Sequence, residues 1–307
     1  METQKLPQSL EKALSRLTAN KAHSTGNAAQ CAISLPCSAC QDHKGIRLEN
    51  DGVFIKASLC SCVTTCKICA GTCAKPESGG VIDCQKPSPV KIVGLLNDAK
   101  IPGRYVDASI KNFSNFTGSG KTVMAQIMRW IEHFVPGKSS GLLLTGSVGV
   151  GKTYVISAVA KELALRGISV RFADFYQLVN ELRDAYSSDG KSMSPTKPLH
   201  DFEVLVIDEL GKGRNTEWEV SIADSLISDR YNGNKSIIAS TNYGLKEGNT
   251  DATQRTIDLW STGPQSSNQM NAESFENLNK RLGPRIFSRL KEMTVFLELT
   301  GADFRRH

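Results

Sequence analysis

The 307-residue sequence has no uninterrupted apolar run near the roughly 20 residues that a membrane-spanning helix needs. Its opening stretch, METQKLPQSLEKALSRLTANK, also lacks the apolar core of a signal peptide. Neither sign of charge is scarce: 37 Lys and Arg stand against 31 Asp and Glu, and the net +6 is compatible with nucleic-acid binding without requiring it. With 40% apolar and 22% charged residues, the chain is of ordinary globular composition. These features predict a cytoplasmic protein of about two domains with no membrane partner.

Cysteine is missing from residues 85–307, because all nine cysteines lie between Cys31 and Cys84. Thiols stay reduced in the cytoplasm, so a disulfide framework is less favoured than metal binding, with redox chemistry second. Cys37 and Cys40 are followed after nineteen residues by Cys60 and Cys62. Each close pair puts two thiolates on one turn, and a hairpin between the pairs would bring all four together around zinc. The spacing predicts a structural zinc ribbon that depends on its metal to fold.

The remaining cysteines leave several alternatives open. A second zinc site could be formed by Cys66, Cys69, Cys73 and Cys84. Ligands could also be exchanged between the two sets, Cys31 would then be spare, and His23 and His43 are alternative ligands. Free thiols are the remaining alternative, although so many exposed thiols would oxidise.

Changes in cysteine content and in the spacing of apolar residues divide the chain into three regions. Residues 1–30 begin with apolar residues at helical spacing and read as an amphipathic helix and linker; residues 31–90 are the Cys-rich module; residues 91–307 alternate strands with helices. Strands are predicted at 141–146, 168–174, 204–210, 236–241 and 295–300, and helices at 153–166, 175–186, 217–231 and from the end of a polar insertion near 272 to about 290. This order predicts an α/β fold whose parallel sheet carries helices on both faces.

A phosphate-binding loop follows the first of these strands. The run GSVGVGKT fits G-x-x-x-x-G-K-[ST] and comprises Gly146, Ser147, Val148, Gly149, Val150, Gly151, Lys152 and Thr153. Its backbone N–H groups would hold ATP phosphates at a helix N-terminus, Lys152 would reach the β- and γ-phosphates, and Thr153 would ligate Mg²⁺. The alternative is a chance Gly-rich turn. A second run, Thr117–Thr122, has Asn115 where the first Gly belongs and no preceding apolar strand, so we interpret it as a polar loop.

Polar residues end two further strands at the edge where open parallel sheets bind ligands. Asp208 and Glu209 are the last two residues of the run VLVIDE. Asp208 would hold Mg²⁺ together with Thr153, and Glu209 would polarise an attacking water. Asn242, after SIIAST, could touch the γ-phosphate or orient that water. The alternatives are solvated acids and an ordinary turn residue. Together with the phosphate loop, this pattern predicts ATP hydrolysis.

From about Ile101 onward, the chain resembles the DnaC/DnaI-type helicase loaders and the related IstB transposition ATPases of the AAA+ superfamily. The matching stretches are IPGRY with Phe113 and Phe116, GLLLTGSVGVGKT, RFADFYQLVNELRDAY, VLVIDELGKGRNTEW, DRYN, IIASTNY, RLGPRIFSRLKEM and GADFRR. The resemblance implies a P-loop AAA+ domain without a C-terminal lid, since the chain stops at His307 soon after the last strand. The insertion LKEGNTDATQRTIDLWSTGPQSSNQMNAESFENLN is longer than the usual family connection.

The resemblance also implies ATPase sites shared between subunits, and hence self-association. In that family, arginines of the segment matching RLGPRIFSRL reach a neighbour's site, which assigns Arg289 first and Arg285 second as catalytic arginines. Their spacing of four puts both on one helical face, where they could instead be solvated surface cations. Arg230 is a weaker candidate.

The function that the resemblance implies is helicase loading in DNA replication, with single-stranded DNA and a replicative helicase as partners and ATP, Mg²⁺ and Zn²⁺ as cofactors. Some family members carry an N-terminal zinc-binding domain that contacts the helicase. Two alternatives stay open: an IstB-like transposition helper ATPase, and a zinc-dependent adaptor that uses ATP as a structural switch without turnover. Basic residues near the sheet edge are candidate DNA phosphate contacts or plain loop charges: Lys191, Lys197, Lys212 and Arg214.

Overall fold

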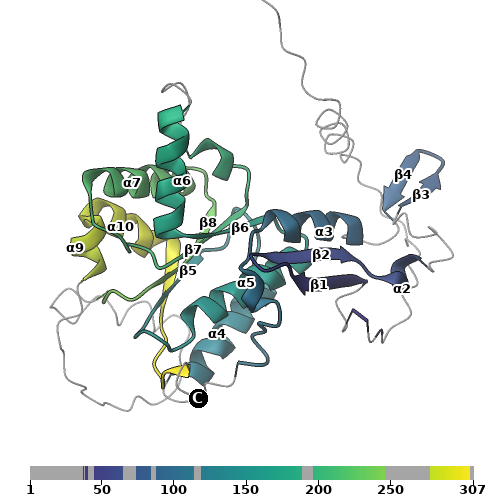
Figure 1. The fold of residues 1–307 in the computed structure, drawn as a ribbon, viewed down its shortest axis with the longest axis horizontal. Helices are drawn as coiled ribbons and strands as arrows, with labels where there is room; N and C mark the ends of the chain where they lie inside the picture. Colours follow the sequence, from purple (N-terminus) through teal and green to yellow (C-terminus); the bar gives the residue numbers. More distant parts are fainter. Residues whose placement is uncertain are drawn as a thin grey trace, which may run out of the picture.

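Five strands of the computed structural model form one parallel sheet in the order β6-β7-β8-β5-β9 (Figure 1). The structure describes residues 37, 39–40, 45–64, 74–83, 88–113, 119–188, 196–245 and 277–304. The strands are β5 (Gly141–Thr145), β6 (Val170–Asp174), β7 (Val204–Asp208), β8 (Ser236–Thr241) and β9 (Thr294–Glu298). All five were expected from the sequence, and their bounds agree within two residues.

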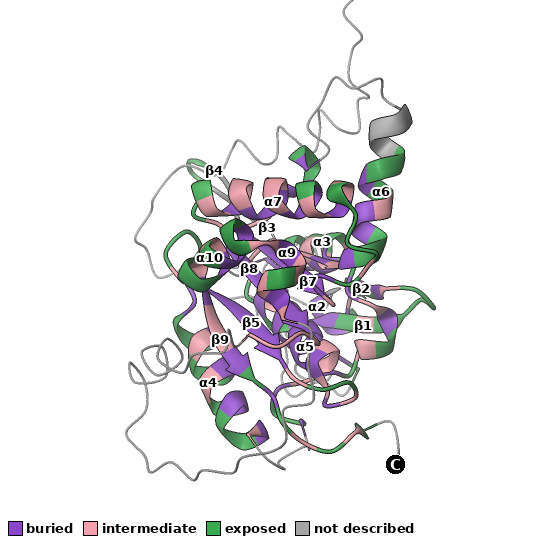
Figure 2. Cartoon of the chain, turned by 90° about the vertical axis from the view of Figure 1, so that its left-hand side faces the viewer, coloured by how far each residue is buried: buried purple, intermediate pink, exposed green. Residues whose placement is uncertain are grey.

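Helices cover both faces of the sheet. One face carries α4 (Gly120–His133) and α5 (Lys152–Leu165), and the other carries α6 (Phe175–Ser188), α7 (Glu217–Asn232), α9 (Leu278–Leu282) and α10 (Pro284–Met293). Side chains alternate between the two cores: Leu142 and Leu144 of β5 pack on the first side and Leu143 on the second. Figure 2 shows the strands buried between helices whose outer surfaces are exposed. This confirms the predicted α/β architecture.

Two local predictions need correction. The helix predicted to run to about residue 290 is divided by Gly283, whose φ of 86° leaves the helical region, and Pro284 starts the new helix at its first position. The run Thr117–Thr122 was predicted to be a polar loop, but among its described residues Gly120 begins α4, and Lys121 and Thr122 are exposed in the first turn of that helix. Lys121 is therefore an exposed residue in the first turn of a helix.

A β-hairpin joins the two cysteine pairs, as the zinc-ribbon spacing predicts. It consists of β1 (Ile46–Asn50) and β2 (Ile55–Leu59) and is followed by the short helix α2 (Ser61–Thr64). The hairpin packs against α3 (Pro89–Asp98), as Figure 1 shows, and its Ile55 belongs to the same core as the helices α4 and α5. The β1–β2 hairpin of the Cys-rich module therefore contacts the α/β core directly.

The remaining elements are short. They are the hairpin β3 (Ala74–Glu77) and β4 (Gly80–Asp83) and the 3-10 turns η1 (Gly103–Tyr105) and η2 (Lys197–Leu199). Among the helices of the described residues, none combines the length and apolar character that crossing a membrane requires.

Several predictions fall outside the described residues. These concern the N-terminal helix within residues 1–30, nearly all of the polar insertion, and the side chains of Cys31, His23, His43, Cys66, Cys69, Cys73, Cys84, Phe116 and Lys191. They remain predictions.

Candidate functional site

The loop between β5 and α5 has the backbone of a phosphate-binding loop. Gly146, Gly149 and Gly151 have φ values of 151°, 87° and 98°, in the region that glycine favours. A Cβ at Gly149 would lie 2.0 Å from the Asp303 carboxylate, so this position also requires glycine for space. Lys152 is buried, and its Nζ donates to the carbonyls of Gly146 and Ser147 at 2.8 Å each. The loop thus curls around its own lysine at the N-terminus of α5, where anions bind.

The predicted magnesium ligands lie together beside this loop. The Thr153 hydroxyl donates to Asp208 Oδ1 at 3.1 Å, and the Ser240 hydroxyl donates to the same oxygen. Burial raises the pKa of Asp208, and the two hydroxyl donors oppose that effect. A hydroxyl and a carboxylate in contact next to a phosphate loop are the hard oxygen ligands that suit Mg²⁺.

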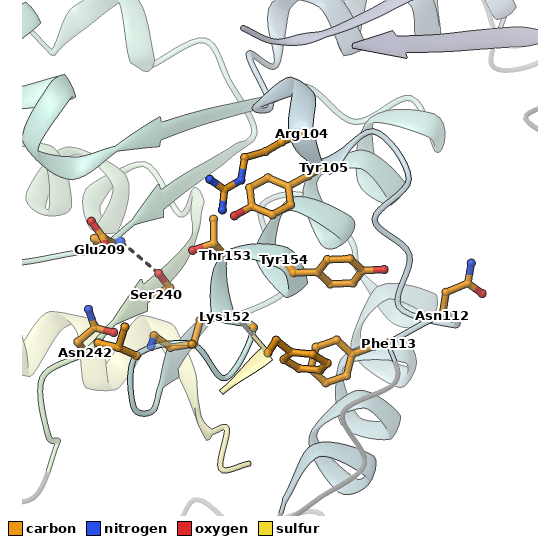
Figure 3. A pocket seen from close by; sticks show the side chains of 14 residues that line it. Arg104, Tyr105, Asn112, Phe113, Lys152, Thr153, Tyr154, Glu209, Ser240 and Asn242 are labelled. Carbon is orange, nitrogen blue, oxygen red and sulfur yellow. Dashed lines mark hydrogen bonds between the residues drawn. The ribbon is translucent and has the colours of Figure 1, made fainter. Parts of the chain in front are cut away.

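Glu209 follows β7 in a conformation rare for a residue other than glycine, with φ at 55°. Its N–H donates to the Ser240 hydroxyl at 3.1 Å, drawn as the dashed line in Figure 3. Its carboxylate accepts a hydrogen bond from Lys212, which raises the pKa of Lys212. Such backbone conformations cost energy and cluster at functional sites. The turn aims Glu209 at the same cavity that Lys152 and Thr153 line.

One cavity of about 360 Å³ unites the phosphate loop with the ends of β7 and β8 (Figure 3). Asn242 lines it beside Glu209 and Lys152, as the sequence predicts. A volume of this size suits a small ligand held by a few convergent polar groups.

The far end of the cavity is aromatic, although no role in the site was predicted for these aromatic residues. Phe113 stacks against Tyr154 and Phe304 with ring centres 5.8 and 5.6 Å apart, and Tyr105 meets Tyr154 edge to face. Arg104 also lines this end. Phe113 and the stretches IPGRY and GADFRR are among the segments that carry the family resemblance, and Tyr154 directly follows the phosphate loop. An aromatic wall next to a phosphate loop can stack on a flat base.

Comparison with known proteins identifies the family. A sequence model of the IstB-like ATP-binding protein family matches residues 96–254, just over half of the 307 residues and including both the phosphate loop and the acid pair. The chain belongs to this family. Over 175 residues it is 22% identical to the replicative helicase loader DnaC of Escherichia coli (strain K12), covering 57% of this chain and 71% of the relative.

Two further similarities support the assignment. The IstB-like chain is 32% identical over 152 residues to an ATP-binding protein in an insertion sequence of Mycobacterium tuberculosis (strain ATCC 25618 / H37Rv), covering 45% of this chain and 57% of the relative. The crystal structure of the DnaC helicase loader matches with a TM-score of 0.50 and 27% identity, over 64% of this chain and 99% of that one. The AAA+ P-loop fold that the sequence predicts is thereby confirmed.

The cysteine cluster lies outside the residues that the family model matches. The Sγ atoms of Cys37, Cys40, Cys60 and Cys62 all lie within 4.8 Å of one another. The Sγ separations of Cys37–Cys60 and Cys40–Cys62 are 3.8 and 3.9 Å. Tetrahedral zinc with Zn–S bonds of about 2.3 Å needs sulfur atoms about 3.8 Å apart, so the four thiols fit the ion.

The surroundings of the thiols also suit a closed metal site. Cys40, Cys60 and Cys62 are buried. A backbone hydrogen bond from Cys62 lowers the pKa of Cys60 to about 7, whereas burial raises the pKa values of Cys40 and Cys62. Without a cation, four thiolates could not share this space, and zinc would stabilise the deprotonated forms.

The predicted arginines lie away from the cavity, on the face of α10 that meets α7. Arg289 donates to Asp224 Oδ1 at 3.0 Å and to the Ser228 hydroxyl at 2.5 Å. Arg285 lies 3.7 Å from the same Asp224 oxygen, and its side chain is 71% exposed against 21% for Arg289. The two share a face, as their spacing of four predicts.

Arg230 is not available to a neighbouring subunit, which corrects its candidacy as a catalytic arginine. Its side chain is 1% exposed, and its guanidinium donates to the carbonyls of Leu199, Phe202, Glu203 and Ser236. Burial lowers the pKa of Arg230 to about 10. This side chain ties the end of α7 to the starts of β7 and β8.

Replacing Arg230 with methionine should therefore destabilise the protein by about 3–5 kcal/mol, because four buried carbonyls lose their charged donor. Urea unfolding checks this. The matched change Arg214→Met, at an exposed side chain, should cost less than about 0.5 kcal/mol. Equal stability of the two variants would contradict the structural role of Arg230.

Proposed function

We propose that this IstB-like protein hydrolyses ATP to ADP and phosphate. The observation that carries the proposal is the single cavity lined by Lys152, Thr153, Glu209 and Asn242. These residues come from three separate segments of the chain, and each has the chemistry that one part of phosphoryl transfer requires.

In this mechanism, the loop N–H groups and Lys152 hold the phosphates at the start of α5. Thr153 and Asp208 would hold Mg²⁺, which supplies Lewis-acid stabilisation of the phosphate oxygens when bound. Glu209 accepts the proton of the attacking water, and Asn242 orients that water or contacts the γ-phosphate. The aromatic end, with Tyr154 and Phe113, stacks on the base.

We assign Arg289 to the ATPase site of a neighbouring copy, with Arg285 as the alternative. Arg289→Ala should lower the rate of ATP hydrolysis only about tenfold, because Arg285 on the same face can substitute in part.

A more specific test measures ATP hydrolysis in a mixture of the Arg289→Ala and Glu209→Gln variants. Sites that pair the Glu209 of one variant with the Arg289 of the other should raise the rate of the mixture above the sum of the rates of the two variants measured separately. Recovery with Arg285→Ala in place of Arg289→Ala would reassign the role to Arg285, and no recovery with either would contradict a shared site.

We further propose that the ATPase acts as a loader of a replicative helicase on single-stranded DNA. The similarity to the loader DnaC in both sequence and fold supports this role. Within it, residues 1–30 and the zinc module of residues 31–90 serve partner contact, and residues 91–307 form the ATPase domain. Such a role on chromosomal DNA implies a cytoplasmic location.

The partner can be identified by capture. The Glu209→Gln variant, charged with ATP, should retain a replicative helicase from host extract, because blocked hydrolysis prolongs the ATP-bound state. The same variant carrying Lys152→Ala is the control and should capture much less. Capture of a transposase would instead support the second candidate, a transposition helper, which the family match and the insertion-sequence relative favour.

A further inference from the structure

The cysteine cluster closes one end of the β1–β2 hairpin. Cys37 and Cys40 precede β1, and Cys60 and Cys62 follow β2, so a metal held by all four would fix the two strand ends together. The Cys60 N–H also donates to the Gly45 carbonyl at 2.8 Å, at the same end. A two-stranded hairpin is marginally stable by itself, so this closure matters for the order of the whole hairpin.

The opposite end of the hairpin is hydrogen-bonded to the segment that leads into the nucleotide cavity. The Ile55 N–H donates to the Ile101 carbonyl at 2.8 Å, and the Gly103 N–H donates to the Val53 carbonyl at 2.9 Å. Asn97 adds a two-way link, since its side chain accepts from the Ala57 N–H at 2.8 Å and donates to the Ala57 carbonyl at 3.1 Å.

The contact at Gly103 is too close for any side chain. A Cβ there would lie 2.1 Å from Asn50 Oδ1 and 2.9 Å from the Phe54 carbonyl. The η1 backbone at Gly103 therefore lies directly against the Val53 and Phe54 carbonyls of the hairpin turn and against the Asn50 side chain.

The position of η1 in turn determines where two residues that line the nucleotide cavity lie. Arg104 and Tyr105 of η1 line the cavity, as Figure 3 shows, and the Arg104 guanidinium lies over the Tyr105 ring at 4.8 Å. A second cavity of about 430 Å³ lies beside the first, and its lining includes Val53 of the hairpin turn together with Asp208 and Glu209. The hairpin turn thus lines a cavity together with Asp208 and Glu209, and it reaches the aromatic end of the nucleotide cavity only through η1.

We propose that the zinc ribbon is a working part of the nucleotide site: the hairpin holds η1 so that Arg104 and Tyr105 face the cavity, and zinc binding thereby strengthens nucleotide binding. This inference rests on the proposed nucleotide and zinc binding and goes beyond a role of the zinc module in partner contact alone. Loss of the metal loosens the hairpin; Gly103 of η1 then loses its backbone partner Val53, and Ile101, just before η1, loses its partner Ile55.

The test compares the zinc-loaded full chain with chain stripped of zinc by a chelator under reducing conditions. The measured quantities are zinc content, the Kd of a fluorescent ADP analogue, and hydrogen exchange at the amides of Ile55 and Gly103. Zinc removal should weaken ADP binding about tenfold and speed exchange at both amides, because loss of one or two hydrogen bonds corresponds to that factor.

Asn97→Ala isolates the coupling from the metal itself. This variant should keep its zinc and yet bind ADP about fivefold more weakly, since its two hydrogen bonds to Ala57 are lost. The matched control is Ser58→Ala, an exposed position on β2 next to Ala57, which should bind like the wild type. An unchanged Kd after verified zinc removal, or unchanged exchange at Gly103, would overturn the inference while leaving the ATPase proposal intact. A zinc-loaded wild type that binds no ADP would overturn both.

Discussion

Replacing Lys152 with alanine should weaken ATP binding about 100-fold, because the charged hydrogen bonds of this buried ammonium to the phosphates are lost. In the structure its Nζ lies at the centre of the loop, bonded to the carbonyls of Gly146 and Ser147. Equilibrium titration with a fluorescent ATP analogue measures the effect, and a circular-dichroism melt shows whether the fold is retained.

Lys121→Ala is the matched control for this experiment. Lys121 also follows a glycine in a GKT run, but it is exposed in the first turn of α4 and is not among the residues that line the nucleotide cavity. ATP affinity should therefore be unchanged in Lys121→Ala. Equal affinities of the two variants would contradict the assignment of the nucleotide site.

Glu209→Gln should leave ATP binding nearly intact and reduce hydrolysis by about 10²- to 10⁴-fold, the range typical of losing a general base. The amide keeps the size of the side chain. The ion pair to Lys212 is lost, but both side chains are partly exposed, so the stability should change by less than about 1 kcal/mol. Phosphate release at saturating MgATP measures the rate.

Glu217→Gln is the control for the change of charge, since Glu217 is exposed in the first turn of α7 and outside the lining of the cavity. Its rate should match the wild type. Equal, near-zero rates in the wild type and in Glu209→Gln would instead favour the adaptor that uses ATP as a structural switch.

The features that the sequence predicts well are those formed by neighbouring residues. The phosphate loop is contiguous, and its glycines, lysine and threonine each have a role that local geometry defines. The pairing of Cys37 and Cys40 with Cys60 and Cys62 was also predictable, because short spacings and one hairpin suffice to assemble them. Asp208, Glu209 and Asn242 were placed correctly because the carboxyl ends of parallel strands meet at one edge.

Contacts between distant segments could not be derived from sequence. The order of the five strands, with β9 beside β5, depends on long-range pairing that local patterns do not encode. The contact of Phe304 with Phe113 and the packing of the hairpin on α3 also join segments that are far apart in the sequence. The prediction that Arg230 could be a catalytic arginine was wrong because no sequence pattern distinguishes a buried arginine bound to backbone carbonyls from an arginine on the surface.

Single-turnover phosphate release shows whether one cavity both binds and hydrolyses ATP. Wild-type chain in excess over ATP, with Mg²⁺ and single-stranded DNA, should release phosphate, and Glu209→Gln under the same conditions should bind the ATP and retain it. Bound ATP that stays intact in the wild type, or is cleaved equally fast in Glu209→Gln, would contradict the account.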